Sequence, residues 1–225
     1  MFNTDRPRVT LTYAQSLDGS IAARSGAPLA LSGTESMTYT HQLRATHDAI
    51  LVGIGTVLSD NPRLDVRLVD GPAPRPIVLD SDLRCPIAAR CLAANRRPIV
   101  ATTDRASAVL RRDLEAQGVT VLSIPQCGAN AAYLDLAALL DRLRAESIQS
   151  IMVEGGARVI TSFLRARLVD RLIITIAPVL VGGLHGVIDL LADDVRLFPR
   201  LQHATWQQLG GDWVVSGSPA WSHAA

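Results

Sequence analysis

Lysine is absent from this sequence, and all 22 of its basic residues are arginines. A chain without lysine amines cannot form the Schiff bases that carbonyl substrates or pyridoxal phosphate require. Any phosphate group that the protein binds must therefore be held by arginine, by backbone amides or by the positive end of a helix.

Cysteine and histidine are also scarce. The three cysteines, Cys85, Cys91 and Cys127, are an odd number without metal-binding spacing, which indicates a reducing compartment and no disulfide framework. The five histidines form no ligand pair such as His-x-x-x-His. We therefore expect no structural or catalytic metal.

Neither charge nor hydrophobicity is concentrated in long tracts. The net charge is +1 without a basic run, which argues against nucleic acid as a partner. No apolar run approaches membrane-spanning length, and the N-terminus enters a strand-like segment without a signal peptide. We expect a soluble, cytoplasmic protein. At 225 residues and 48% hydrophobic, the chain is predicted to form one domain, 1–225.

Strand and helix patterns alternate along the chain, which predicts an α/β fold with a mostly parallel central sheet. A Gly-Gly turn at Leu209–Asp212 adds an antiparallel C-terminal hairpin. Ser32 or Thr34 is the expected cap of the first helix. The expected strands are 8–14, 49–52, 76–80, 98–102, 119–124, 151–154 and 171–177, and the expected helices are 35–45, 106–117, 134–145 and 157–167.

The segment Ser150–Ser162 carries the strongest functional pattern. An apolar strand ends at Glu154, two glycines follow, and an amphipathic helix begins. Backbone N–H groups at a helix N-terminus can hold a phosphate, and glycine lets the anion approach the backbone. An ordinary β–α turn is the alternative reading.

A second glycine-rich segment, Ala49–Leu64, has a similar organisation. Its strand opens into Gly53-x-Gly55, followed by Thr56 and an Asp60-Asn-Pro turn. Leu58 stands where a dinucleotide fingerprint needs its third glycine, and no Walker Gly-Lys follows. The segment predicts phosphate or ribose binding of a non-Rossmann kind.

Polar residues follow several of the expected strands, and in an α/β sheet such positions meet in one cleft. Three of the candidates also have simpler interpretations. Asp60 can begin an Asx-Pro turn, Asp18 suits a tight turn, and Arg44 can be an ion-pair partner on a helix surface. The residues expected at the cleft are Asp18, Thr56, Asp60, Ser81 and Glu154.

Seven segments in register resemble the reductase domain of riboflavin biosynthesis, a family with a dihydrofolate-reductase-like three-layer fold. The resemblance covers about residues 6–183. The segments are Val9–Gly19, His41–Ala45, Asp48–Thr56, Asp60–Leu64 with Val66–Arg67, Val78–Ser81, Val153–Gly156 and Ala177–Gly183.

The resemblance implies an NADPH-dependent reduction of a ribosylaminopyrimidine 5′-phosphate, with hydride delivered to ribose C1′. The zinc signature of the deaminase that is often fused to this domain is absent. The free-standing members act before deamination, but the 2,5-diamino-pyrimidinone and the deaminated uracil forms both stay open as substrates. The family also implies a homodimer, for which the apolar segment Arg171–Val181 is a candidate interface edge.

The resemblance also implies roles for individual residues. Asp60 and, second, Glu154 are the candidates for the catalytic acid. The implied substrate contacts are Arg44, Leu64, Arg67 and Glu154, and Ser16 lies within reach of the same cleft. The implied cofactor contacts are Thr56, Asp60, Ser81, Gly155, Gly156, Ala157, Arg158, Val159, Ile160, Thr161 and Ser162.

Two positions depart from the pattern of many bacterial members. Thr12 replaces a lysine, and Ala30 stands where a tryptophan is frequent. The loss of that aromatic side chain affects the packing on the nicotinamide side and the identity of the substrate. Two alternatives stay open: an NADPH-dependent reductase of another pteridine- or pyrimidine-like compound, and a nucleotide-binding module without turnover.

Overall fold

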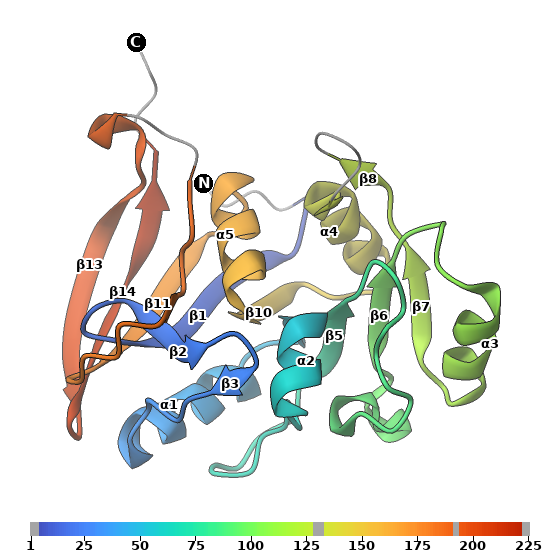
Figure 1. Cartoon of the computed structure of the whole chain (residues 1–225), viewed down its shortest axis with the longest axis horizontal. Coiled ribbons are helices and arrows are strands. Elements are labelled where there is room, and N and C mark those ends of the chain that lie inside the picture. Colours follow the sequence, from blue (N-terminus) through green and yellow to red (C-terminus); the bar gives the residue numbers. More distant parts are fainter. Residues whose placement is uncertain (1–4, 128–132, 191–193, 222–225) are drawn as a thin grey trace.

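The computed structural model describes residues 5–127, 133–190 and 194–221. A nine-stranded sheet runs through it in the order β13-β14-β11-β1-β10-β4-β5-β6-β7 (Figure 1). The seven strands from β11 to β7 are parallel, whereas β14 pairs antiparallel with β11 and β13 antiparallel with β14. The strands are β1 (Arg8–Ser16), β4 (Ala49–Gly53), β5 (Arg75–Leu79), β6 (Ile99–Thr102), β7 (Thr120–Ser123), β10 (Ser150–Gly155), β11 (Arg171–Ala177), β13 (Arg200–Leu209) and β14 (Asp212–Ala220).

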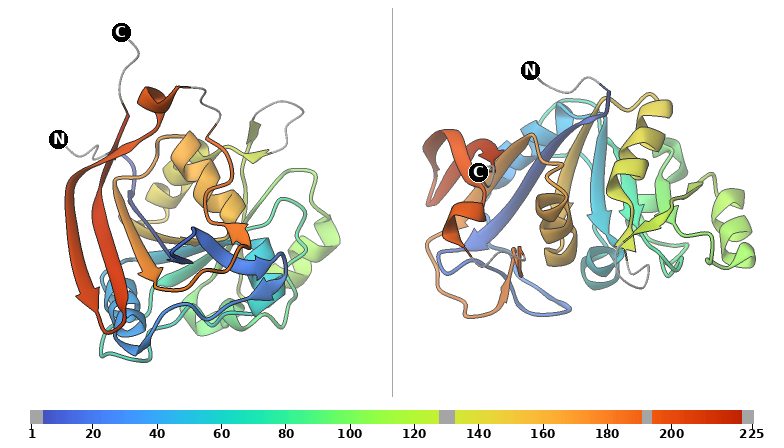
Figure 2. Two further views of the ribbon diagram at one scale, coloured as in Figure 1. Left: turned by 60° about the vertical axis from the view of Figure 1, so that its left-hand side comes forward. Right: turned by 90° about the horizontal axis from the view of Figure 1, so that it is seen from above.

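Helices cover both faces of this sheet, which gives three layers (Figure 2). On one face, α4 (Leu136–Ala145) and α5 (Ala157–Arg165) pack on residues such as Leu11 and Leu51. On the other face lie α1 (Thr34–Ala45), which packs on residues such as Met152, and α2 (Ile54–Asp60) and α3 (Ala108–Ala116), which pack on residues such as Ile50. Because side chains alternate between the faces, a strand with two covered faces is apolar along its whole length.

Short elements complete the fold. A three-stranded sheet of β2 (Ser20–Arg24), β3 (Ala27–Pro28) and β12 (Leu184–His185) follows β1, and β8 (Gln126–Cys127) pairs with β9 (Tyr133–Leu134). The 3-10 segments among the described residues are Arg90–Leu92, Ala94–Arg96 and Val195–Leu197.

The expected α/β architecture, the parallel sheet and the C-terminal hairpin are confirmed. Two expectations are wrong. Neither Ser32 nor Thr34 caps α1: the N-cap residue is Gly33, and Asp212 accepts hydrogen bonds from the Gly33 N–H (2.8 Å) and the Ser36 hydroxyl. The segment Arg171–Val181 is not an edge, because β11 lies between β1 and β14.

Candidate active site

The predicted functional segments meet at the carboxyl edge of four adjacent strands, β1, β10, β4 and β5. Ser16 ends β1, Gly155 ends β10, and Gly53 ends β4. Parallel strands bring these ends together although they are far apart in sequence. In α/β sheets this edge is where ligands bind.

The glycine turn between β10 and α5 is built for close approach. The Thr56 hydroxyl of α2 accepts a hydrogen bond from the Gly156 N–H at 3.2 Å. A Cβ on Gly53 would lie 2.8 Å from the Val159 side chain, so glycine is needed where the two turns touch. Gly156 is the N-cap of α5, and no described side chain caps it. The first N–H groups of α5 are therefore available to an anion.

Glu154, directly before this turn, forms a two-bond ion pair with Arg44 of α1. The Arg44 Nε–Glu154 Oε1 distance is 2.6 Å and the Nη2–Oε2 distance is 2.7 Å. The β10–β4 register shifts between Val153 and Gly155, which turns Glu154 out of the regular ladder. Burial lowers the pKa of Arg44, but attraction to Glu154 and their hydrogen bonds outweigh it and raise that pKa overall.

A pocket of about 270 Å³ lies beside this pair. Asp65, close to the pocket, receives Arg63 Nε and Arg67 Nη1 on its two carboxylate oxygens, each at 2.7 Å. Burial opposes ionisation of Asp65, but the hydrogen bonds from Arg67 and Arg63 hold its pKa below the ordinary value. The pocket is lined by Arg44, Pro62, Arg63, Leu64, Arg67 and Arg90.

The loop that carries these arginines, Asn61–Arg67, is anchored from several sides. Arg96 donates to the carbonyl groups of Arg63 (2.7 Å) and Leu64 (2.5 Å). Arg44 donates to the Asp65 carbonyl at 3.0 Å. The Asn61 side chain accepts from the Arg90 N–H at 2.9 Å, which ties the loop to the 3-10 segment. The pocket is thus a built structure rather than a set of loose surface arginines.

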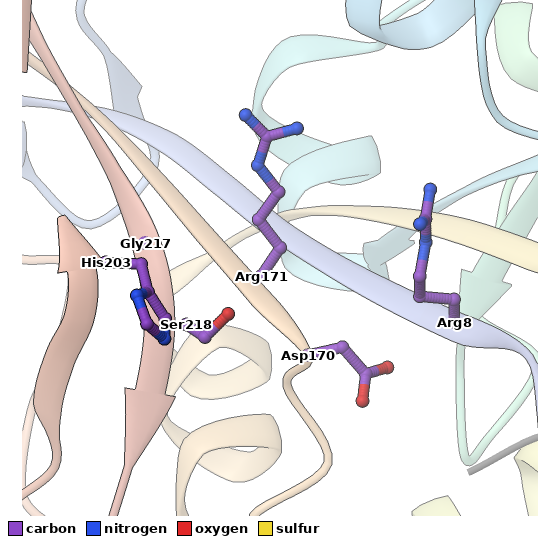
Figure 3. A pocket seen from close by; sticks show the side chains of 6 residues that line it. All are labelled: Arg8, Asp170, Arg171, His203, Gly217 and Ser218. Carbon is purple, nitrogen blue, oxygen red and sulfur yellow. The ribbon is translucent and has the colours of Figure 1, made fainter. Parts of the chain in front are cut away.

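A second concavity, of about 190 Å³, lies at the opposite, amino edge of β1 and β11. Arg8 and Arg171 extend to the same side, away from His203 and Ser218 (Figure 3). Asp170 is already bonded to Arg6 at 2.8 and 2.7 Å and to the Val9 N–H. These residues do not converge on one point, in contrast to the arginine pocket.

Comparison with known proteins shows the family to which this fold belongs. A sequence profile of the RibD C-terminal domain matches residues 7–215. The chain belongs to the RibD C-terminal domain family. The chain is 35% identical to a 2,5-diamino-6-ribosylamino-4(3H)-pyrimidinone 5′-phosphate reductase of Methanothermobacter thermautotrophicus, over 94% of this chain and the whole relative.

One further relative and two solved structures are also similar to this chain. A riboflavin biosynthesis protein RibD of Aquifex aeolicus is 34% identical over 94% of this chain, which spans 57% of that protein's length. The solved structure of the Saccharomyces cerevisiae riboflavin biosynthesis reductase Rib7 has a TM-score of 0.77 and 34% identity, and the match covers 98% of this chain and 93% of that one. A dihydrofolate reductase of Enterococcus faecalis, with a TM-score of 0.50 and 12% identity, is similar in fold alone.

Within this RibD-type fold, seven of the predicted site residues form two groups. Thr56, Gly155, Gly156 and the exposed Arg158 surround the glycine turn, and Arg44, Leu64 and Arg67 line the pocket. Asp60 is exposed at the last residue of α2, just before the pocket loop. Ser81 follows β5, where its carbonyl accepts the hydroxyl groups of Thr102 and Thr103, each at 3.0 Å.

Several residues predicted to contact a ligand have side chains that are buried in the core or hydrogen-bonded to other parts of the chain. Leu64, Val159 and Ile160 are buried in the apolar core, and the Thr161 hydroxyl accepts the Ile188 N–H. These residues can meet a ligand only through their backbone. Ala157 is buried and Ser162 is half-buried on the first two turns of α5.

Ser16 and Asp18 form a structural clamp at the end of β1. The fully buried Ser16 hydroxyl donates to Asp18 at 2.5 Å, and the Asp18 carboxylate accepts the N–H groups of Val181 and Gly182. The Ser16 hydrogen bond, followed by those two backbone bonds, lowers the pKa of Asp18. Asp18 therefore has the turn role that its position before Gly19 suggested.

Sequence reasoning missed Arg63, Arg90, Asp65, Arg96 and His41. Arg63 and Asp65 lie inside a motif already singled out, so alternating charge at 63, 65 and 67 was an available signal. Arg90 lines the pocket and Arg96 anchors its loop, and both come from short 3-10 segments without a recognisable sequence pattern. In the described part of the chain, no helix is both long and apolar enough to cross a bilayer. The same residues contain no group of three or more metal-ligating side chains.

Proposed function

We propose that this chain reduces a ribosylaminopyrimidine 5′-phosphate to its ribitylamino form with NADPH, the hydride being delivered to ribose C1′. The observation that carries this proposal is the arginine pocket joined to an uncapped helix N-terminus through the Arg44–Glu154 pair. Two anionic groups, one on the substrate and one on the cofactor, thereby have neighbouring sites. Family membership and the reductase names of the relatives support the same reaction, with residues 1–225 acting as one reductase domain.

The glycine turn fits the pyrophosphate of a nicotinamide cofactor, because its helix N–H groups are uncapped and glycine keeps the backbone accessible. Gly155 to Ser162 would wrap this group through their backbone, with Thr56 and Asp60 beside it and Ser81 on the adenosine side. The exposed Arg158 would add charge for a 2′-phosphate. When bound, the cofactor supplies the hydride, and the protein supplies position and charge.

Arg44, Arg67 and the Leu64 backbone would bind the substrate, with its phosphate facing the arginines of the pocket. Glu154 already accepts two bonds from Arg44, which suits a carboxylate that orients a substrate hydroxyl or amine. Ser16 would need to exchange its bonds to Asp18 and Ser20 to reach the substrate. Asp60 is our first candidate for the proton donor.

Oxidation of NADPH, followed at 340 nm, tests the function directly. We expect turnover with the 2,5-diamino-pyrimidinone phosphate or with the deaminated uracil phosphate, and the preferred one places the reaction before or after deamination. Cofactor binding without turnover of either substrate would contradict the proposal. It would leave a reductase of another pteridine-like compound or a nucleotide-binding module.

Replacing Asp60 with asparagine is expected to lower kcat at least hundredfold while cofactor affinity stays within about threefold, because general acid catalysis contributes about 10²–10⁴-fold. Asp113→Asn, which neutralises an exposed carboxylate on α3, is the matched control. An Asp60→Asn enzyme with unchanged kcat would assign proton delivery to another group or to water.

Replacing Thr56 with valine tests the glycine turn. The substitution keeps the side-chain shape but removes the oxygen that accepts the Gly156 N–H. We expect the NADPH Kd to rise about threefold to tenfold, the cost of one misplaced hydrogen-bond donor. Fluorescence titration measures the effect, and Thr56→Ser should restore wild-type binding. An unchanged Kd for the valine variant would remove this contact from the cofactor site.

The exposed C-terminal hairpin supports a homodimer. β13 is an edge strand with nearly all of its side chains exposed, and Trp206 is 63% and Trp213 47% exposed. An unpaired edge with two large aromatic side chains is typical of an interface, and a second copy of the chain is the proposed occupant. Sedimentation velocity tests whether the chain forms this dimer.

The three free cysteines support a reducing, cytoplasmic location.

A further inference from the structure

His41 is a fully buried histidine that contacts the backbone of the arginine pocket. It lies on α1, three residues before Arg44, and its Nδ1 accepts a hydrogen bond from the Arg67 N–H at 3.1 Å. An accepting Nδ1 carries no proton, so the neutral ring has its proton on Nε2. Nε2 has no hydrogen-bond partner among the described residues.

The surroundings of His41 favour its neutral form. Burial and then the positive charges of Arg44 and Arg67 lower its pKa below the ordinary value of about 6.5. Asp65 and Glu154 act in the opposite direction, but both carboxylates are already bonded to arginines. At neutral pH the ring is therefore an acceptor toward Arg67.

We propose that neutral His41 is a positioning residue that fixes Arg67 for substrate phosphate, and that a second ring proton releases this contact and weakens substrate binding. The imidazolium would direct an Nδ1–H at the Arg67 N–H, so that two donors face each other. Arg44 and Arg96, which hold carbonyl groups of the same loop, stay charged throughout the working pH range. His41 is thus the titratable member of this set of anchors.

This inference rests on the proposed function, because it assigns the substrate phosphate to the pocket of Arg67. It deepens that function by predicting that substrate affinity falls in acid because His41, a group of the protein, gains a proton. The second ionisation of the substrate's phosphate monoester, near pH 6, adds a separate pH dependence of affinity. The experiment must therefore compare variants at each pH.

His41→Asn is the decisive variant, because its side-chain oxygen can accept from the Arg67 N–H but does not titrate. We expect its KM for the preferred pyrimidine phosphate to match that of the wild type at pH 8. As the pH falls through the lowered pKa of His41, below 6.5, the wild-type KM should rise above that of His41→Asn, by about threefold to tenfold once the ring is protonated, the effect of one lost hydrogen bond. The two kcat values should agree within about twofold at every pH.

His41→Leu removes the acceptor and should have the raised KM at every pH. Should this variant fail to fold, the comparison between wild type and His41→Asn carries the test alone. Equal pH profiles for those two proteins would overturn the proposal. A wild-type KM that falls below that of His41→Asn in acid would also overturn it, since the added charge would then dominate.

Failure of the proposed function gives a different result. If wild type reduces neither pyrimidine phosphate, calorimetry with ribose 5-phosphate measures the same pocket without turnover. The wild-type Kd should rise above the His41→Asn Kd in acid by the same factor. Parallel Kd profiles, or no binding of ribose 5-phosphate at pH 8, would overturn the role of His41.

Discussion

Replacing Glu154 with alanine should lower the free energy of unfolding by about 3 kcal/mol and abolish turnover. The substitution leaves the Arg44 guanidinium buried without its carboxylate, and breaking a buried pair costs about 3–5 kcal/mol. The side chains of Arg44 and Glu154 are 11% and 16% exposed, which places the expected cost at the lower end. Denaturant unfolding measures the loss of stability, and NADPH oxidation measures turnover.

The pair between Arg6 and Asp170 is a matched control. It is also a two-bond ion pair, formed by Nη1 and Nη2 of Arg6, and its side chains are 16% and 17% exposed, but it lies at the amino edge of the sheet. Asp170→Ala should cost similar stability and leave kcat/KM unchanged. If Asp170→Ala reduced turnover as strongly as Glu154→Ala, the activity loss would follow from lower stability and not from the site.

The double variant Arg44→Ala/Glu154→Ala distinguishes the stability cost of an unpaired buried charge from the loss of turnover. It should be more stable than Glu154→Ala, because no uncompensated charge remains, while still lacking turnover. If the losses in unfolding free energy of the two single variants added up to the loss of the double variant, the ion pair would contribute little to folding.

The parts of this fold that sequence predicts are those with local causes. Apolar runs such as Ala49–Val52 predict buried strands because both of their faces are covered by helices. Gly118, with φ of 79°, ends α3 as its position predicts. The glycines before α5 mark a turn at the ligand edge. Each of these signals lies within a few residues of the element that it sets.

The parts that sequence does not predict depend on long-range contacts. The start of α1 is held by Asp212, which accepts the Gly33 N–H from 179 residues away in the sequence. Arg90 reaches the pocket through its 3-10 segment, and no periodic pattern predicts that position. The helix after Gly53 was missed because its seven residues are too few to show a helical period. The charges at Arg44 and Glu154 were both singled out, but not their pairing.

Substitution of Arg67 should have a large effect on the use of substrate, and this effect should be selective for the phosphorylated substrate. The Arg67 guanidinium reaches the pocket but is bound only to Asp65 among the described residues, so substrate phosphate can compete for it. Hydrogen bonds to charged groups contribute about 1.5–3 kcal/mol. Arg67→Ala should therefore lower kcat/KM for the phosphorylated substrate about tenfold to hundredfold. With the dephosphorylated nucleoside, the same substitution should change kcat/KM less than twofold.

The ratio between the two substrates distinguishes phosphate recognition from general damage. Arg112→Ala is the matched control and should change neither value, because Arg112 lies on the exposed surface of α3 and donates to the Ala108 carbonyl of its own helix. Arg90→Ala tests the guanidinium that sequence reasoning missed. A loss comparable to that of Arg67→Ala would show that the phosphate lies between the loop and the 3-10 segment. If Arg67→Ala lowered kcat/KM equally for both substrates, the pocket would serve another part of the substrate, because removing a phosphate ligand cannot affect a molecule without phosphate.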